Sequence, residues 1–210
     1  NKRYSKVVAD DTNKIKKMIS PINKLTESNY ESLSNKIIQL VDEEYLVPYI
    51  IETLVEYSLT HHIYIPLYVG ILKRMLSNQT KSIIERYCNK FHNKVFSDEI
   101  MNTKQSSYLN LFYKNKKTDN IIGFSLFITH VEENEILTGQ ISKVLSSFMD
   151  NVLKMDKEDE IYKMLISFHN ISEIKFKKKI PEIYIQQLQE LKNKNLSSKI
   201  KFKIMDILGE

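Results

Sequence analysis

Apolar residues recur three or four positions apart along most of the chain, and very little interrupts them. The 210 residues include only four glycines and four prolines. Sheets of many strands need turn residues every few positions, whereas long helices need few of them. Because the apolar residues follow the period of an α-helix, each segment carries one apolar stripe that another segment must cover. The sequence therefore predicts an all-α fold.

The predicted helices follow one another with short polar links. Three of them start at Tyr30, at Pro66 and near Thr80. The others lie at 46–60, with Pro48 in the first turn, and at 137–148, 161–168, 184–191 and 200–208. In all there are about nine or ten, and they pair in order into hairpins of about 40 residues, the period of HEAT-like repeats. We expect an α-solenoid of about five antiparallel helix pairs. We also expect these pairs to form a single domain over residues 1–210.

Two segments depart from the amphipathic pattern. Residues 97–118 are polar and lysine-rich, so we expect a long connection that leaves room for a helix around Tyr108 to Phe112. Residues 120–131, NIIGFSLFITHV, are apolar almost all the way round. A helix of this kind is buried between neighbours, although its Ile, Phe and Thr content leaves a strand as the minority reading.

The helix near Tyr30 has two candidate start signals. If Thr26 is the N-cap, Leu25 and Tyr30 occupy the two positions of a hydrophobic staple. If Ser28 is the cap, Glu31 completes a capping box. The sequence does not choose between these registers, but either one starts a helix here.

Composition limits the environment of the protein. The 42% hydrophobic and 27% charged fractions are ordinary for a folded chain. The single cysteine, Cys88, excludes an internal disulfide framework and fits a reducing compartment. The sequence has no apolar run of about 18 residues and no signal-peptide pattern, so we expect a cytoplasmic protein that does not enter membranes. The net charge of +5 is compatible with nucleic-acid binding, although dispersed charge is usually a solvated surface.

The sequence offers no pattern that points to catalysis. Motifs for nucleotide phosphates and for an activated serine are absent, and the five histidines lack the spacing of a metal site. The acidic clusters at 132–135 and 156–160 fit helix starts better than a catalytic pair of carboxylates. We therefore expect no enzymatic activity, no cofactor and no metal.

Five blocks of sequence are spread over nearly the whole chain. They are NKLTESNYESLSNKIIQL at 23–40, VPYIIETLVEYSL at 47–59, SIIERYCNKFHN at 82–93, NIIGFSLFI at 120–128 and LSSKIKFKIMDILGE at 196–210. In this order and at this spacing, the blocks resemble the middle domain of the eukaryotic translation initiation factor four-gamma family. The first and last blocks are the most specific part of the resemblance.

The resemblance implies a non-enzymatic scaffold that holds both lobes of a DEAD-box RNA helicase of the translation initiation type and often contacts RNA. The family's helicase-binding positions fall here on Ile22, Leu25, Tyr30 and Phe202. The chain would be a fragment of a larger scaffold in a cap-binding complex, with the cap-binding protein bound only by regions outside it. A middle-domain scaffold of nonsense-mediated decay, splicing, nuclear cap binding or translational repression is the nearest alternative.

Helical geometry separates these four candidate contacts. In the last helix the isoleucines cluster on one face and Phe202 points nearly opposite, which predicts an exposed anchor unless the helix buries both faces. The staple gives Leu25 and Tyr30 a local packing role as well as the implied binding role. Periodicity does not assign Ile22.

A second candidate surface is basic. Phosphate contacts need positive charges on an accessible ridge, and an adjacent aromatic side chain such as Phe176 can stack on a base. A solvated lysine loop is the commoner meaning of such a segment. Direct binding of RNA, including mRNA, is therefore a rival function, and its candidate residues are Lys175, Lys177, Lys178, Lys179, Lys201 and Lys203.

Overall fold

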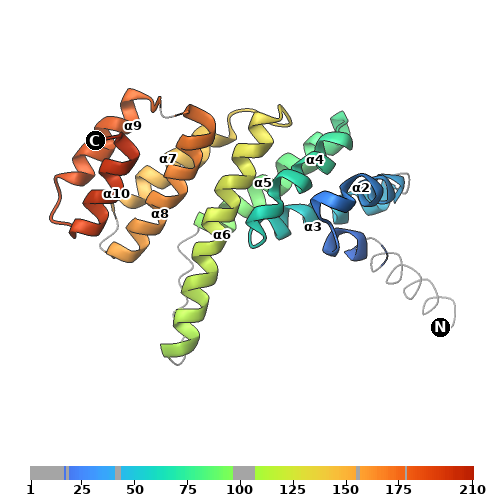
Figure 1. The fold of residues 1–210 in the computed structure, drawn as a ribbon, viewed down its shortest axis with the longest axis horizontal. Coiled ribbons are helices and arrows are strands. Elements are labelled where there is room, and N and C mark those ends of the chain that lie inside the picture. Colours follow the sequence, from blue (N-terminus) through green and yellow to red (C-terminus); the bar gives the residue numbers. More distant parts are fainter. Residues whose placement is uncertain (1–16, 18, 41–43, 97–106, 155–156, 178) are drawn as a thin grey trace. The chain divides into compact units, whose positions relative to one another are not determined.

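The computed structural model describes residues 17, 19–40, 44–96, 107–154, 157–177 and 179–210, with side chains outside 94–118 (Figure 1). Within these ranges the elements are helices and none is a strand, which confirms the predicted all-α fold and removes the strand reading of 120–131. The α-helices are α2 Tyr30–Gln39, α3 Val47–Ser58, α4 Ile65–Arg74, α5 Asn78–Phe96, α6 Ser107–Glu133, α7 Gln140–Val152, α8 Glu158–Ile171, α9 Glu182–Lys192 and α10 Ser198–Leu208.

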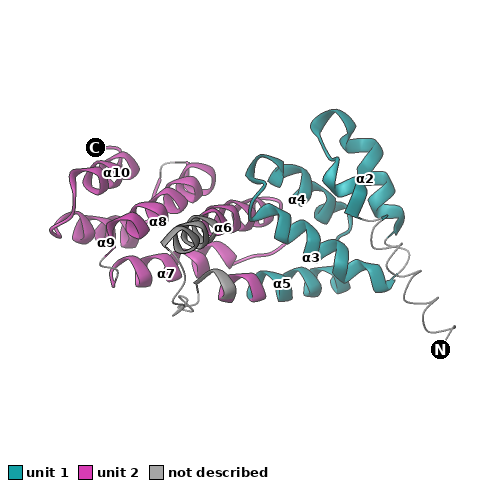
Figure 2. Ribbon diagram, turned by 90° about the horizontal axis from the view of Figure 1, so that it is seen from below, with its two compact units in different colours: residues 1–89 teal, residues 90–210 magenta. Residues whose placement is uncertain are grey.

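Short helical turns join or extend these helices. The 3-10 turns are η1 Glu27–Asn29, η3 Glu44–Leu46 and η4 His62–Tyr64, and the π-helical segment η5 Ser172–Phe176 follows α8. The helices group into two compact units, residues 1–89 and 90–210 (Figure 2). The single domain expected over residues 1–210 stays a prediction.

Local start signals place the first helices. η1 begins directly after Thr26, whose amide donates a hydrogen bond of 2.8 Å to Oδ1 of Asn29. The structure therefore selects Thr26 as the cap over Ser28, which lies inside η1. Pro48 and Pro66 lie in the first turns of α3 and α4, as predicted, where proline costs no helical hydrogen bond.

In unit 1, α2 and α4 lie side by side and run in the same direction. Tyr30 at the start of α2 meets Gly70, and Arg74, one turn further along α4, donates hydrogen bonds to Ser34 and Asn35, one turn further along α2. The pairs 30–70 and 34–74 are both 40 residues apart, the repeat length expected from the sequence. The helices α2 and α4 form one layer, and α3 and α5 form the other (Figure 2).

Unit 2 has the same alternation. The Ser197 amide, just before α10, donates to Oε1 of Glu158 at the start of α8, so α8 and α10 start at the same end. Lys175, just after α8, donates to Glu133 at the end of α6, so α6 and α8 finish at the same end. One layer holds α6, α8 and α10, and the other holds α7 and α9 (Figure 2). This ladder of helix pairs is the solenoid-like arrangement predicted from the sequence.

The apolar segment 120–131 lies in α6 and is buried between α7 and α8, as predicted. Phe124 and Phe127 are among the largest fully buried side chains. Ser125 and Thr129 are also buried, and each donates its hydroxyl to the carbonyl four residues earlier in the helix. These bonds remove the cost of burying two polar groups in an apolar layer.

The long connection predicted for residues 97–118 is wrong over its second half. α6 begins at Ser107 and runs without a break to Glu133, so the helix expected only around Tyr108 to Phe112 belongs to a much longer one. Residues 97–106 lie outside the described part of the chain. Polar composition lowers the apolar periodicity but supplies no stop signal, and a helix already nucleated by its buried half extends at little cost.

The close contact between Tyr30 and Gly70 gives a prediction for stability. A Cβ at position 70 would lie 2.5 Å from the Tyr30 hydroxyl and 3.3 Å from Cζ. Overpacking costs about 1–3 kcal/mol, which exceeds the gain of about 1 kcal/mol from replacing a helical glycine with alanine. We expect Gly70→Ala to lower the free energy of unfolding by about 1 kcal/mol in urea titrations.

The matched background is Tyr30→Phe, which removes the hydroxyl that the new Cβ would meet. In this background Gly70→Ala should be neutral or stabilising, because the higher helix propensity of alanine is then no longer offset by a clash with the Tyr30 hydroxyl. An equal loss of stability in both backgrounds would contradict the steric explanation.

Candidate interaction surfaces

Phe202 lies on the exposed side of α10. The helix packs on α8 and α9 through Ile200, Ile204 and Ile207, which are at most 6% exposed, whereas Phe202 is 67% exposed. The predicted orientation of Phe202 is therefore confirmed, while its role in binding stays a prediction. Aromatic side chains are enriched at binding hot spots, so this residue is a candidate anchor for a partner.

The charges around Phe202 are held by neighbouring side chains. One turn earlier, Nζ of Lys199 lies 4.0 Å from the centre of the Tyr162 ring in α8, a cation–π contact. One turn later, Asp206 accepts a hydrogen bond of 2.9 Å from Lys203. Phe202 thus projects from a surface whose polar side chains are already positioned by α8 and α10.

The candidates in and just before the first block belong to unit 1 and are packed. Ile22 is 1% exposed and Leu25 is 4% exposed, so neither offers surface to a partner. Tyr30 is half-buried against Gly70. Burial raises the pKa of the Tyr30 hydroxyl, while the nearby Arg74 guanidinium acts in the opposite sense. The structure assigns these three side chains to packing, and their implied contact with a helicase stays a prediction.

Two of the six candidate lysines are engaged in ion pairs within unit 2. Nζ of Lys175 donates to Glu133 over 2.8 Å and lies 3.8 Å from Glu132. The hydrogen bond with Glu133 raises the pKa of the Lys175 amine. Lys203 contacts both Asp206 and the imidazole of His169. These two charges are already balanced by acidic neighbours, which weakens them as phosphate contacts.

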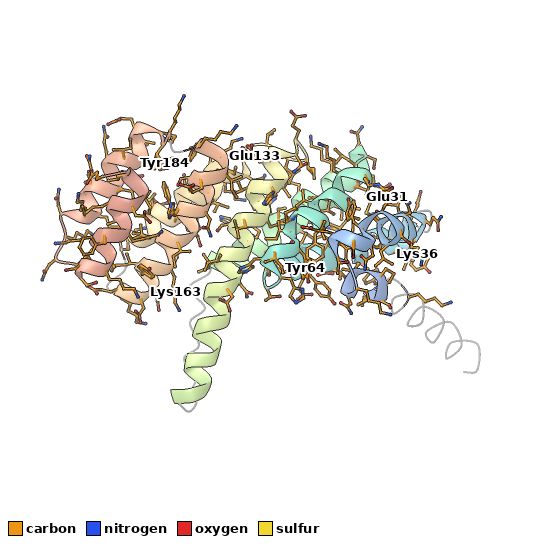
Figure 3. The ribbon with its side chains drawn as sticks, in the orientation of Figure 1. Glu31, Lys36, Tyr64, Glu133, Lys163 and Tyr184 are labelled. Atoms are coloured by element: carbon orange, nitrogen blue, oxygen red, sulfur yellow. The ribbon has the colours of Figure 1, made fainter. Side chains whose placement is uncertain are left out.

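The remaining lysines differ in accessibility. Lys177 and Lys179 are exposed and Lys201 is half-exposed, and none of the three pairs with an acidic side chain in the described part of the chain. Lys178 lies outside the described residues. Phe176, the predicted stacking residue, lies with its ring centre 6.4 Å from that of Tyr184 (labelled in Figure 3). Of the five lysines that the structure describes, Lys177 and Lys179 are therefore the exposed loop charges, and the nearby Phe176 ring already packs near Tyr184.

The most exposed large apolar side chain among the described residues is one that no sequence pattern singles out. Ile63 is 81% exposed and lies in η4, between α3 and α4. Close to it in sequence, the Tyr57 ring lies against the rings of His61 and Tyr68, and the Tyr64 ring lies against that of Tyr68, with ring centres 5.3 to 6.4 Å apart. Burial raises the pKa of Tyr68 to about 12. We call residues 57–68 the aromatic corner of unit 1; Figure 3 labels Tyr64 within it.

A signal for the aromatic corner is present in the sequence. Residues 57–72 contain no Asp, Glu, Lys or Arg, although these residues make up 27% of the chain. An uncharged run is expected for a buried helix, and α4 is largely buried. The run also covers the exposed link before α4, where solvated charges are the norm.

Neither a protein-family model nor a curated protein sequence matches the chain. Among the described residues, no three His, Cys, Asp or Glu side chains are placed to hold a metal ion. Of the helices that the structure describes, none is long and apolar enough to cross a membrane. Among the described residues, the most exposed large apolar side chains are Ile63, Phe202 and Ile183, at 81%, 67% and 61%.

The exposed fraction of neighbouring residues in α10 gives a second prediction. Phe202→Ala removes little buried surface, so it should shift the melting temperature by no more than about 2 °C. Ile204→Ala empties a fully buried position and should lower the free energy of unfolding by about 2–5 kcal/mol. Melts followed by circular dichroism measure both effects. A Phe202→Ala variant as unstable as Ile204→Ala would make Phe202 a core residue.

Proposed function

We propose that the chain is the helicase-binding middle domain of a translation initiation scaffold of the four-gamma type. The observation that supports this proposal most directly is the exposure of the Phe202 side chain. This residue closes the SSKIKF block, where the resemblance places a helicase contact, and it is also the apolar side chain that α10 leaves 67% exposed. The ladder of helix pairs with a 40-residue offset supports the same proposal, because a solenoid presents extended binding surfaces.

In this proposal the chain contributes geometry and the helicase contributes ATP chemistry. The two lobes of the helicase bind different parts of the chain, which raises the effective concentration of each lobe near the other. Binding shifts the helicase toward its closed, RNA- and ATP-engaged state only if the contacts are better in that state. The chain acts in the cytoplasm, within a cap-binding complex whose cap-binding protein contacts regions outside it.

The candidate residues then have two kinds of role. Phe202 is the direct contact. Ile22 and Leu25 hold the turn before α2 in shape, as their burial supports. Tyr30 fixes α2 against Gly70 of α4. The exposed surface of the first block, and not its buried side chains, is what a helicase lobe meets.

Direct RNA binding is the weaker alternative. The exposed Lys177 and Lys179 favour it, because phosphate contacts need accessible positive charge. The ion pairs of Lys175 and Lys203 reduce the charge available to it. A middle-domain scaffold of another RNA pathway is the alternative within the same class, and the identity of the bound helicase distinguishes it.

The test is an ATPase and binding titration of a purified DEAD-box helicase of the translation type. We expect the wild-type chain to stimulate RNA-dependent ATP hydrolysis, and Phe202→Ala to weaken the apparent affinity by about tenfold or more. Ile183→Ala is the matched control, because Ile183 is another exposed apolar residue of unit 2, at 61%. Absence of both binding and stimulation by the wild-type chain would reject the proposal.

A parallel titration with single-stranded RNA addresses the alternative. RNA binding without helicase, falling steeply with salt and lost in Lys177→Glu/Lys179→Glu, would support direct RNA binding. We expect instead weak RNA binding that Phe202→Ala leaves unchanged, because Phe202 carries no charge.

A further inference from the structure

We propose that His169 is a proton-operated switch that decides whether the Lys203 amine is held against α8 or turned to solvent beside Phe202. All three side chains belong to unit 2, and the inference does not depend on the identity of a binding partner. The ligand of this switch is the proton, and its output is the charge of the surface around Phe202.

The switch consists of one imidazole between charged groups of two elements. His169 lies near the end of α8, and its side chain is 21% exposed. On one side of the ring, Nε2 lies 3.4 Å from Oε1 of Glu173 in η5. On the other side, Nδ1 contacts Nζ of Lys203 in α10 and lies 3.6 Å from Oδ2 of Asp206. In the part of the chain that the structure describes, α6 and α7, which also pack on α8, contribute no hydrogen bond or ion pair to this ring.

The contact with Lys203 assigns the protonation state of the ring. An ammonium group carries three N–H donors and no acceptor, so Nδ1 must offer its lone pair to Lys203. We therefore assign the imidazole as neutral, with its proton on Nε2 and facing Glu173. Lys203 also donates a hydrogen bond of 2.9 Å to Oδ2 of Asp206, so one amine holds both the ring and the carboxylate.

A second proton on the ring is incompatible with this arrangement. Protonation of Nδ1 places an N–H and a positive charge against the Lys203 ammonium, and two donors form no hydrogen bond. Oδ2 of Asp206 is the acceptor within reach of both cations, 3.6 Å from Nδ1 and 2.9 Å from the Lys203 amine. The imidazolium therefore pairs with Asp206 on one side and Glu173 on the other, and the Lys203 amine leaves the ring.

The helices stay in place when the ring is protonated, because other contacts hold α10 on α8. At the start of α10, the Ser197 amide donates to Glu158 of α8. One turn further, Lys199 lies over the ring of Tyr162. The apolar side of α10, with Ile204 fully buried, also packs within unit 2. Since none of these contacts involves His169, protonation changes the pairing of side chains and not the fold.

The position of the switch gives it a consequence for the surface of α10. Lys203 follows the exposed Phe202 in sequence, and Asp206 lies one turn after Phe202. While His169 is neutral, Lys203 and Asp206 balance each other's charge. Once His169 is protonated, Asp206 pairs with the imidazolium and the Lys203 amine turns to solvent. The surface around Phe202 thus becomes more positive as the pH falls, which changes the charge that an approaching molecule meets.

The first test is nuclear magnetic resonance of the full chain at about pH 8 and about pH 5.5, on either side of the range in which histidine ordinarily titrates. We expect a cross-peak between the Hε protons of Lys203 and Hε1 of His169 at the higher pH, and its loss at the lower pH. Absence of the cross-peak at the higher pH, or its persistence at the lower, overturns the inference. Circular dichroism should show equal helix content at both pH values. Loss of helix at the lower pH also overturns the inference, because the switch requires α8 and α10 to stay packed.

A matched variant supplies the second test. His169→Gln keeps an acceptor for Lys203 but takes up no proton, and it leaves the other histidines in place. Brief acetylation followed by mass spectrometry compares Lys203 with Lys201, another lysine of α10. We expect the ratio of Lys203 to Lys201 labelling to rise about fivefold from the higher to the lower pH in wild type, as loss of one hydrogen bond allows, and to stay constant in His169→Gln. No rise in wild type, or an equal rise in both chains, contradicts the assignment of the switch to His169.

Discussion

Stacking of alternate helices is the constraint on which the rest of this structure depends. Each helix carries an apolar stripe that its hairpin partner covers only in part, so the helix two positions along must complete the cover. In unit 1 this requires α2 and α4 to approach closely, which the missing side chain of Gly70 permits and the Arg74 hydrogen bonds orient. In unit 2, α8 receives the same cover from α6 and α10. Because stacking uses one side of each helix, it also decides which side chains face water, and Phe202 is one of them.

Features set by local chemistry could be predicted from the sequence. The prolines at 48 and 66 mark helix starts, and the rotation of about 100° per residue separates Phe202 from the isoleucines of α10. Features that depend on distant residues or lack periodicity could not. The partner of Lys175 lies 42 residues away in sequence, so no spacing rule reveals that its charge is balanced. Ile63 lies in a three-residue 3-10 turn, which is too short for a pattern to show which way a side chain points.

The distribution of charge favours protein contacts over nucleic-acid contacts in the candidate sites. A net charge of +5 is informative only when positive side chains are accessible and unpaired. Glu132 and Glu133 face Lys175, and Asp206 faces Lys203, so part of the basic surface near the end of α8 is neutralised within the fold. The surfaces that remain distinctive are apolar, and apolar surfaces recognise shape and hydrophobicity without reference to a phosphate backbone.

Small apolar surfaces also suit the proposed mechanism better than large ones. In the described part of the chain, exposed large apolar side chains such as Phe202, Ile63 and Ile183 lie on three different elements. If, as we propose, each helicase lobe meets only a small apolar contact on the chain, stable binding needs both lobes to be engaged together. A scaffold that gripped each lobe tightly would bind the open and closed helicase alike, and a ligand with equal affinity for two states shifts neither. Under the proposed function, two weak contacts that are satisfied together only when the lobes are correctly arranged would convert binding energy into a preference for one state.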